Sequence, residues 1–145
     1  MIQNDWAYLE KYALENQKLL NQDNEGNRIV FIGDSITEFW EQYDSFFFSQ
    51  NNYINRGISS QTSVHVLERF DNDVINLKPK GVIILVGIND IAENYGPISL
   101  EEIMVNITSM VDKSLKNNIE VLLCSVLPAN SFYWNPKIQP IDKIM

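Results

Sequence analysis

Apolar residues along the chain fall into short runs typical of buried strands and longer stretches with helical spacing. The strand-like runs lie at residues 29–32, 53–56, 82–86 and 120–127. The helix-like stretches lie at residues 6–22, 36–48, 66–77 and 103–115. The run at 82–86 is apolar at every position, which is expected of a strand covered on both faces.

Local signals mark the ends of these helices. Asp5 is the predicted cap of the first helix, and Ser99 and Glu102 have the spacing of a capping box. Pro79 predicts the end of the third helix. The apolar faces predicted for the first and last helices consist of Leu9, Ala13 and Leu20 and of Ile103, Ile107, Met110, Val111 and Leu115.

Strands and helices alternate throughout, so the sequence predicts an α/β fold with a doubly wound parallel sheet and right-handed crossovers. We expect one domain over residues 1–145. In such sheets, ligands bind at the carboxyl ends of the strands. The loops expected there are 33–35, 57–62, 87–90 and 128–130, and the first three are rich in Gly, Ser, Asn and Asp.

The composition and charge of the chain limit the classes of partner that it is expected to bind. Of the 145 residues, 45% are hydrophobic and 21% are charged, as in ordinary globular proteins. The net charge of -8 and the lack of a basic stripe disfavour nucleic acid, which leaves small molecules or proteins. Cys124, the single cysteine, lies in an apolar run and is expected to be a buried thiol. With neither a leader pattern nor an apolar run of membrane-spanning length, the chain reads as cytoplasmic, unless a signal has been removed.

Several common site motifs are absent. The chain has neither G-x-G-x-x-G nor G-x-x-x-x-G-K-[ST], and G-x-S-x-G does not surround Ser35. One histidine and one cysteine, far apart, do not provide zinc-ligand spacing. We therefore expect no cofactor and no metal.

Ser35 follows the first predicted strand directly and opens a helix. One interpretation makes it a helix cap, since serine and aspartate are preferred there. The other makes it a nucleophile, because its hydroxyl would leave the strand end at a helix N-terminus that favours developing negative charge. Asn89, at the end of the central strand, and a backbone N–H near Ser60 would then complete a three-donor oxyanion hole.

The segments G-D-S-I at 33–36, N-R-G-I-S-S-Q-T at 55–62 and G-I-N-D at 87–90 resemble, in order and spacing, the first three blocks of the GDSL or SGNH esterase and acylhydrolase family. Further similarity to a bacterial subgroup of acylhydrolases extends over nearly the whole chain. The resemblance implies a flavodoxin-like three-layer α/β/α fold, Ser35 as nucleophile, and the second-block N–H and the Asn89 side chain as oxyanion donors. Asp34, Gly57 and Asp90 would support them, with Asp90 holding its loop.

The chain departs from the family in its second block. The family's oxyanion glycine corresponds to Ser60 and not to Gly57. Since the donor is a backbone N–H, serine can supply it, provided that the turn does not require a positive φ.

The second departure is the missing catalytic base. The family carries a late D-x-x-H pair, which this sequence lacks, and its only histidine is His65. We expect His65 on a helix surface near the mouth of the site, with the role of a substitute base as the alternative. The resemblance implies a domain incomplete at its C-terminus, without a fifth strand and a last helix. The fourth strand would then be an open edge prone to pairing, and turnover would be very weak.

Three functions remain open. The first is an ester hydrolase acting on small O-acyl or acetyl esters through an acyl-serine intermediate. The second is a catalytically silent form that retains ligand binding or self-association. The third is a flavodoxin-like binding module, which flavin absorbance would reveal. Phe132 and Trp134 either pack against the core or line an acyl pocket, and we favour the pocket. Arg56 is either a surface residue or a structural tether behind the second-block loop, and we expect the tether.

Overall fold

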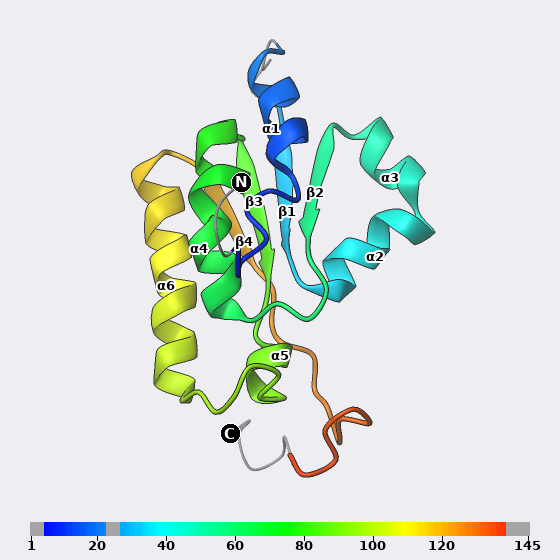
Figure 1. Cartoon of the computed structure of the whole chain (residues 1–145). Coiled ribbons are helices and arrows are strands. Elements are labelled where there is room, and N and C mark those ends of the chain that lie inside the picture. The colour runs from blue at the N-terminus through cyan, green and yellow to red at the C-terminus, as the bar shows by residue number, and fades with distance from the viewer. Residues whose placement is uncertain (1–4, 23–26, 139–145) are drawn as a thin grey trace.

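The computed structural model describes residues 5–22 and 27–138. In chain order its elements are α1 (Ala13–Leu20), β1 (Ile29–Gly33), α2 (Ser35–Tyr43), α3 (Ser45–Gln50), β2 (Tyr53–Gly57), α4 (Ser63–Asp73), the 3-10 helix η1 (Ile75–Leu77), β3 (Gly81–Leu85), α5 (Ile88–Ile91), α6 (Leu100–Lys116) and β4 (Glu120–Leu123) (Figure 1). None of the described helices is long and apolar enough to cross a membrane.

The four strands form one parallel sheet in the order β2-β1-β3-β4, which confirms the predicted α/β class. From β1 the chain passes to β2 on one side, and then back across the sheet to β3 on the other. The crevice at the carboxyl ends of β1 and β3 is therefore the topological switch point, where doubly wound sheets bind their ligands. The loops that follow β1, β2 and β3 meet there.

One face of the sheet is covered by α4 and α6, which pack against each other (Figure 1). The core on this face consists of buried aliphatic and aromatic side chains: Val30, Ile32, Val66, Phe70, Val74, Leu77, Val82, Ile84, Val86, Ile103, Ile107, Met110 and Ile119. The predicted capping box is present, since the Ser99 side chain accepts from the N–H of Glu102. From the helix-like stretch predicted at residues 66–77, Val66, Phe70, Val74 and Leu77 lie in this core.

The opposite face of β1 and β2 carries α2 and α3, where one predicted helix is broken into two. At Asp44 the backbone leaves the helix, with φ −142° and ψ 68°. The Asp44 carboxylate then accepts from the Phe47 N–H at 3.0 Å and starts α3. The break turns Phe47 and Phe48 onto Phe31, with ring centroids 6.0 and 5.2 Å away. Aromatic packing therefore outweighs continuation of the helix.

The first helix also differs from its prediction. It begins at Ala13, and Asp5 instead accepts from the N–H groups of Leu9 and Glu10 in a preceding turn. Ala13 and Leu20 are exposed, whereas Asn16 is buried. The predicted face was wrong because α1 packs against polar groups of other elements. Asn16, and not an apolar residue, faces these groups and hydrogen-bonds to them.

The C-terminal half of the described chain shows three smaller differences. The fourth strand ends at Leu123, four residues earlier than predicted, and it lies at the sheet edge. Cys124, which follows it, is half-buried and not buried as expected. In α6, Ser114 is buried and Leu115 is 59% exposed, because the last turn of the helix presents Ser114 to the core.

Candidate active site

The turn between β1 and α2 places Ser35 at the first position of a helix. Asp34, not Ser35, caps this helix, since its side chain accepts from the Ile36 N–H at 3.0 Å. Among the described residues, none hydrogen-bonds to the Ser35 hydroxyl. The capping function is thus assigned to the neighbouring residue, and the hydroxyl stands at the positive end of a nine-residue helix with no partner in the described chain.

Two glycines let α2 approach the strand ends closely. A Cβ at Gly33 would lie 2.5 Å from Thr37 Oγ1 of α2, and a Cβ at Gly57 would lie 2.1 Å from the Glu38 backbone nitrogen of the same helix. No side chain fits at such distances. Gly57 is therefore required for the close packing of α2, whereas its supporting role in the site stays a prediction.

The loop after β2 forms a tight turn beside Ser35. The Gln61 N–H donates to the Ile58 carbonyl at 3.4 Å, and the Ser59 N–H donates to the Glu38 carboxylate on α2 at 2.6 Å. Within the described chain, no group accepts from the Ser60 N–H. The loop is thus anchored on both sides of Ser60, and the N–H of Ser60 is left for a ligand.

Ser60 adopts a positive φ of +66°. Serine replaces the family glycine without cost only if the turn does not require a positive φ, and this condition is not met. A non-glycine residue in this left-handed region costs roughly 1 kcal/mol or more. The loop keeps its shape at the expense of backbone strain at Ser60.

Asn89, in the short helix α5, has a side chain oriented by two hydrogen bonds. One Nδ2 hydrogen is donated to the Gln61 carbonyl at 2.9 Å, and the Oδ1 accepts from Asn94 Nδ2 at 2.9 Å. The Asn94 bond fixes which end of the amide is the donor. The second Nδ2 hydrogen is not committed to any described group.

These three residues line one cavity of about 590 Å³ at the carboxyl edge of the sheet. Its lining consists of Ser35, Ser60, Asn89, Asn94, Tyr95, Tyr133 and Trp134. The structure thus brings together the hydroxyl and the two donor residues that the sequence singled out. No three His, Cys, Asp or Glu side chains within the described ranges are grouped as metal ligands.

Two buried carboxylates lie behind the cavity. Asp90 accepts from both the N–H and the hydroxyl of Ser63, which ties the α5 loop to the start of α4. Burial raises the pKa of Asp90, although the Ser63 hydrogen bonds oppose the rise. Burial also raises the pKa of Asp34 to about 6, with a smaller contribution from the negative charge of Asp90. Asp34 Oδ2 has no described hydrogen-bond partner.

His65 does not lie on the surface, contrary to the prediction. Its side chain is 5% exposed, because Trp6 and Tyr95 pack on its ring at centroid distances of 5.1 and 4.2 Å. The Nδ1 lies 2.8 Å from Thr62 Oγ1. Burial, and then the charge of Arg69, lower the pKa of the imidazole. His65 lines a neighbouring cavity of about 480 Å³ and not the cavity of Ser35.

The aromatic residues after β4 divide between the core and the cavity. Phe132 is buried against Ile91 and Ala92, so it packs the core. Trp134 lines the cavity and donates from Nε1 to Asn94 Oδ1 at 2.9 Å. The sequence reasoning missed Asn94, Tyr95 and Tyr133; the N-Y-G-P loop directly after G-I-N-D was the available signal for the first two.

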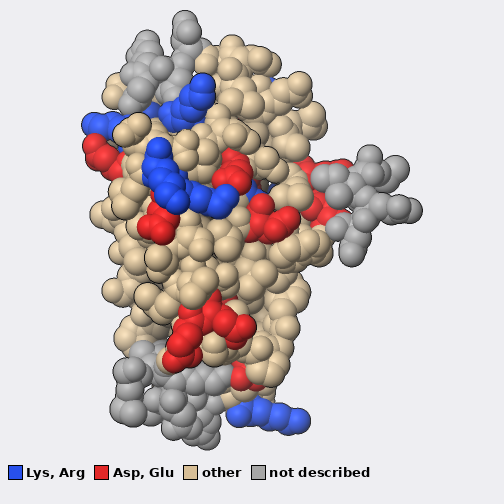
Figure 2. Space-filling model, turned by 90° about the vertical axis from the view of Figure 1, so that its left-hand side faces the viewer, with Lys and Arg blue, Asp and Glu red and all other residues tan. Residues whose placement is uncertain are grey.

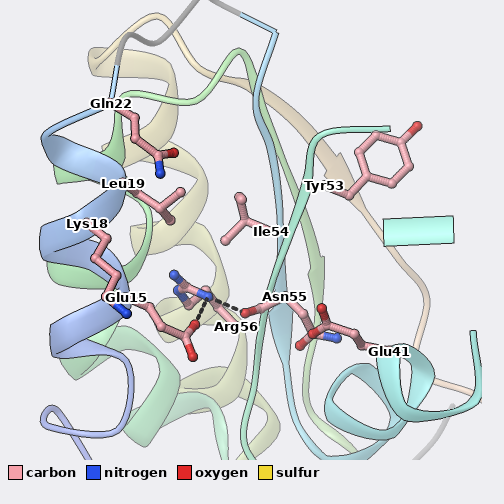
Figure 3. Close-up of a pocket in the computed structure, with 9 residues that line it drawn as sticks. All are labelled: Glu15, Lys18, Leu19, Gln22, Glu41, Tyr53, Ile54, Asn55 and Arg56. Carbon is pink, nitrogen blue, oxygen red and sulfur yellow. Dashed lines mark hydrogen bonds and ion pairs between the residues drawn. The ribbon is translucent and has the colours of Figure 1, made fainter. Parts of the chain in front are cut away.

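Arg56 lies behind the site in a hollow between α1 and β2 (Figure 3). Its guanidinium donates to Asn16 Oδ1 at 2.8 and 2.9 Å, to the Asn55 carbonyl at 2.6 Å and to Glu15 at 3.3 Å. Figure 3 shows the last two of these interactions as dashed lines. Arg56 therefore joins α1 to β2, as expected of a structural tether.

The chain is similar to known proteins over most of its length. It matches a crystal structure of a candidate acylhydrolase from Bacteroides fragilis with a TM-score of 0.90 and 47% identity, covering 94% of this chain and 65% of that one. A GDSL-like lipase from Bacteroides thetaiotaomicron matches with a TM-score of 0.88 and 45% identity, covering 92% of this chain and 65% of that one.

A curated relative is more distant. The human platelet-activating factor acetylhydrolase IB subunit alpha2 is 32% identical over 92 residues, which is 61% of this chain and 39% of that subunit. A sequence model described as the GDSL-like lipase/acylhydrolase family matches residues 31–143. With its fold, its three motif loops and this match in agreement, the chain belongs to the GDSL-like lipase/acylhydrolase family.

Proposed function

We propose that this chain is the part of an ester hydrolase that carries the nucleophile and the oxyanion hole, with Ser35 as the nucleophile. The observation that carries the proposal is the single cavity lined by Ser35, Ser60 and Asn89. Each follows a different strand at the carboxyl edge of the sheet, so their convergence is a product of the fold and not of sequence proximity.

The proposed reaction uses these groups in turn. The Ser35 oxygen bonds to the acyl carbon and its proton passes to a base, while the carbonyl oxygen becomes an oxyanion. The N–H groups of Ser35 and Ser60 and the free Nδ2 hydrogen of Asn89 hold that oxyanion. The tetrahedral intermediate expels the alcohol, which takes up a proton and leaves an acyl-serine. Water then releases the carboxylic acid and regenerates Ser35.

The oxyanion donors account for most of the expected rate enhancement. Preorganised donors of this kind are worth about 10²–10³ in rate each, because they need no reorientation during the reaction. The Asn89 donor is preorganised by Asn94 and Gln61. The helix N-terminus at Ser35 adds to the stabilisation of negative charge.

Small O-acyl esters are the proposed substrate class, with acetyl esters first. The cavity of about 590 Å³ is bordered by solvent-exposed aromatic residues. It therefore has room for an alcohol group larger than the acyl group. The similarity to proteins described as an acylhydrolase, a lipase and an acetylhydrolase supports ester cleavage and leaves the alcohol undefined.

A second candidate is a catalytically silent form, favoured by the position of His65. It is the only histidine in the sequence, and it is buried in the neighbouring cavity with Nδ1 beside Thr62. Without a base, serine is a poor nucleophile, and loss of a triad member leaves roughly 10³–10⁴-fold catalysis over water in serine proteases.

Labelling with a fluorophosphonate tests the nucleophile assignment. The chain is incubated with the reagent in the presence of imidazole, which supplies a base, and the modified peptide is located by mass spectrometry. We expect one addition, at Ser35, and none in Ser35→Ala. Ser60 lines the same cavity and serves as an internal control. Addition at Ser60, or an equal reaction of Ser35→Ala, would refute the assignment.

A further inference from the structure

Arg69 is a charged residue in the middle of the apolar face of α4. Its side chain is 0% exposed and lies between the core residues Val66 and Phe70 in sequence. A buried charge is strongly destabilising unless it is paired and fully hydrogen-bonded. Nothing in the reaction described above requires a positive charge at this place, so the contacts of Arg69 must explain its presence.

The guanidinium joins three separate parts of the structure. Its Nη2 donates to the Gly33 carbonyl at 3.0 Å, directly before the Asp34-Ser35 turn. Its Nε donates to Gln61 Oε1 at 2.6 Å, in the loop that carries Ser60. Its Nη1 pairs with Asp73 at 2.8 Å, one turn along α4. Only the last contact is an ion pair, and the first two lead to the site.

Gln61 extends this connection to the third loop. Its side chain is fully buried and also donates from Nε2 to the Ala7 carbonyl at 2.9 Å. Its backbone carbonyl accepts from Asn89 Nδ2 at 2.9 Å. A continuous path of hydrogen bonds therefore runs from the nucleophile turn through Arg69 and Gln61 to the Asn89 side chain.

We propose that Arg69 is a positioning residue that fixes the separation between the Ser35 turn and the Ser60–Asn89 oxyanion donors. The planar guanidinium supplies donors in fixed directions to two acceptors, one at the end of β1 and one in the loop after β2, which the single ammonium group of lysine cannot do. The catalytic consequence of this arrangement rests on the function proposed above, whereas the geometric consequence does not.

Arg56 provides a matched control for the alternative that Arg69 only stabilises the fold. It is also buried, at 2% exposure, and it also donates several hydrogen bonds. Its acceptors lie on α1 and on β2 itself (Figure 3), and none is in the Ser35 turn or the Ser60 loop. A loss of stability alone should therefore affect both arginine variants alike.

The test compares Arg69→Lys with Arg56→Lys in the whole chain. The rate of fluorophosphonate addition to Ser35 is measured at temperatures where both variants are folded by circular dichroism. We expect Arg69→Lys to react roughly 10- to 100-fold more slowly than the unsubstituted chain, since misplacement by about 1 Å costs that order of rate. Arg56→Lys should stay within about twofold. Equal rates in the two variants would overturn the proposal.

Hydrogen exchange gives a readout that does not depend on reactivity at Ser35. We expect the peptide covering residues 58–62 to exchange at least about tenfold faster in Arg69→Lys, and not in Arg56→Lys. If the unsubstituted chain is not labelled, the proposed function fails, and the exchange result alone decides the positioning role. Unchanged exchange in both variants would overturn it.

A second pair of variants covers the case in which Arg69→Lys does not fold. Gln61→Met removes the acceptor for Arg69 Nε and is expected to reproduce the faster exchange and the slower addition. Gln61→Glu restores an acceptor, and with its charge beside the guanidinium it should recover most of the rate. Failure of Gln61→Glu to differ from Gln61→Met would contradict the proposed contact.

Discussion

Ser60 holds a backbone angle of φ +66° that glycine adopts freely and other residues adopt at a cost. The turn needs this angle because Gln61 closes it onto Ile58 while Ser59 is held by Glu38. This geometry leaves the N–H of Ser60 without an acceptor among the described residues. At the residue scale, the proposed oxyanion donor is therefore strained, and it lies next to the well-formed turn that carries the proposed nucleophile.

Ser60→Gly should stabilise the chain. Relief of the left-handed strain, about 1–2 kcal/mol, exceeds the entropy that glycine adds to the unfolded chain, about 0.4–1 kcal/mol. We expect the urea midpoint to rise by the equivalent of about 0.5 kcal/mol. Asn118→Gly is the control, at φ +57°: because asparagine tolerates this region, that change should be slightly destabilising. A lower midpoint for Ser60→Gly would contradict the strain at this position.

Asp34→Asn should remove a pH dependence of stability. Burial raises the pKa of Asp34 from 3.8 to about 6, so between these values the folded chain holds a proton that the unfolded chain has lost. Stability therefore falls as the pH rises from about 4 to about 6, by an amount on the order of 3 kcal/mol. Asparagine keeps the cap acceptor for Ile36 and stays neutral.

Urea unfolding of both chains between pH 4 and pH 7 measures this difference. The free energy of unfolding of Asp34→Asn is expected to exceed that of the unsubstituted chain at pH 7, with the two curves converging near pH 4. Parallel curves over the whole range would show that Asp34 does not titrate in this window.

At the scale of elements, the site depends on how closely α2 lies against the ends of β1 and β2. Gly33 and Gly57 permit this approach, and Glu38 of α2 in turn holds the Ser59 N–H. The proposed nucleophile and the proposed oxyanion loop are thus placed by the same helix packing. Displacement of α2 is expected to damage both.

Gly57→Ala should be strongly destabilising. The added methyl group would lie 2.1 Å from the Glu38 backbone nitrogen, so α2 has to move. We expect a loss of about 3 kcal/mol in the free energy of unfolding, measured with urea, at the upper end of typical overpacking costs. Gly81→Ala is the control, because its nearest neighbour is a side-chain atom 3.2 Å away. Equal losses in the two variants would argue against close packing at Gly57.

The sequence predicted the sheet well because apolar runs and intervening helices have distinct periods. It predicted the meeting of Ser35, Ser60 and Asn89 because parallel strands end at one edge. The break at Asp44 was missed, since Phe46–Phe48 continue a helical pattern and only packing on Phe31 favours the turn. The polar interface of α1 was missed for a similar reason. Asn16 is buried by partners distant in sequence, Arg56 and Asp73.

The sequence around Arg69 contains a signal for a buried charge. A charged residue beside the core positions Val66 and Phe70 of one helix points to a buried ion pair, although its partners cannot be read from spacing alone. The positive φ of Ser60 likewise could not be predicted from this sequence itself. The only indication was the glycine that the family carries at the corresponding position.

At the scale of the whole molecule, the described helices leave part of the sheet open. Phe31, Ile83 and Leu122 are in register across β1, β3 and β4, yet α2 and α3 cover only the Phe31 side, and Leu122 is 57% exposed. Within the described chain, no strand pairs with the outer edge of β4. On the α4–α6 side, Figure 2 shows basic groups next to acidic ones in the upper half, a separate acidic group in the lower half, and no basic stripe.

We expect a second copy of the chain to pair at this edge, and Leu122→Lys to weaken that association by at least about tenfold. The reason is that an edge lysine places a charge against the apolar face of the neighbouring copy. Sedimentation at increasing concentration measures the effect. Leu14→Lys, at an exposed leucine on α1, should associate like the unsubstituted chain. A monomer at all concentrations, with or without Leu122, would contradict the prediction.

The most direct test of the account is hydrolysis of p-nitrophenyl acetate by this chain and by Ser35→Ala, each with and without added imidazole. We expect a weak hydrolysis rate that depends on Ser35. Added imidazole should raise the rate of the unsubstituted chain by more than it raises the rate of Ser35→Ala. Equal rates for the two chains under both conditions would show that the cavity of Ser35, Ser60 and Asn89 does not activate an ester, and would contradict the central claim.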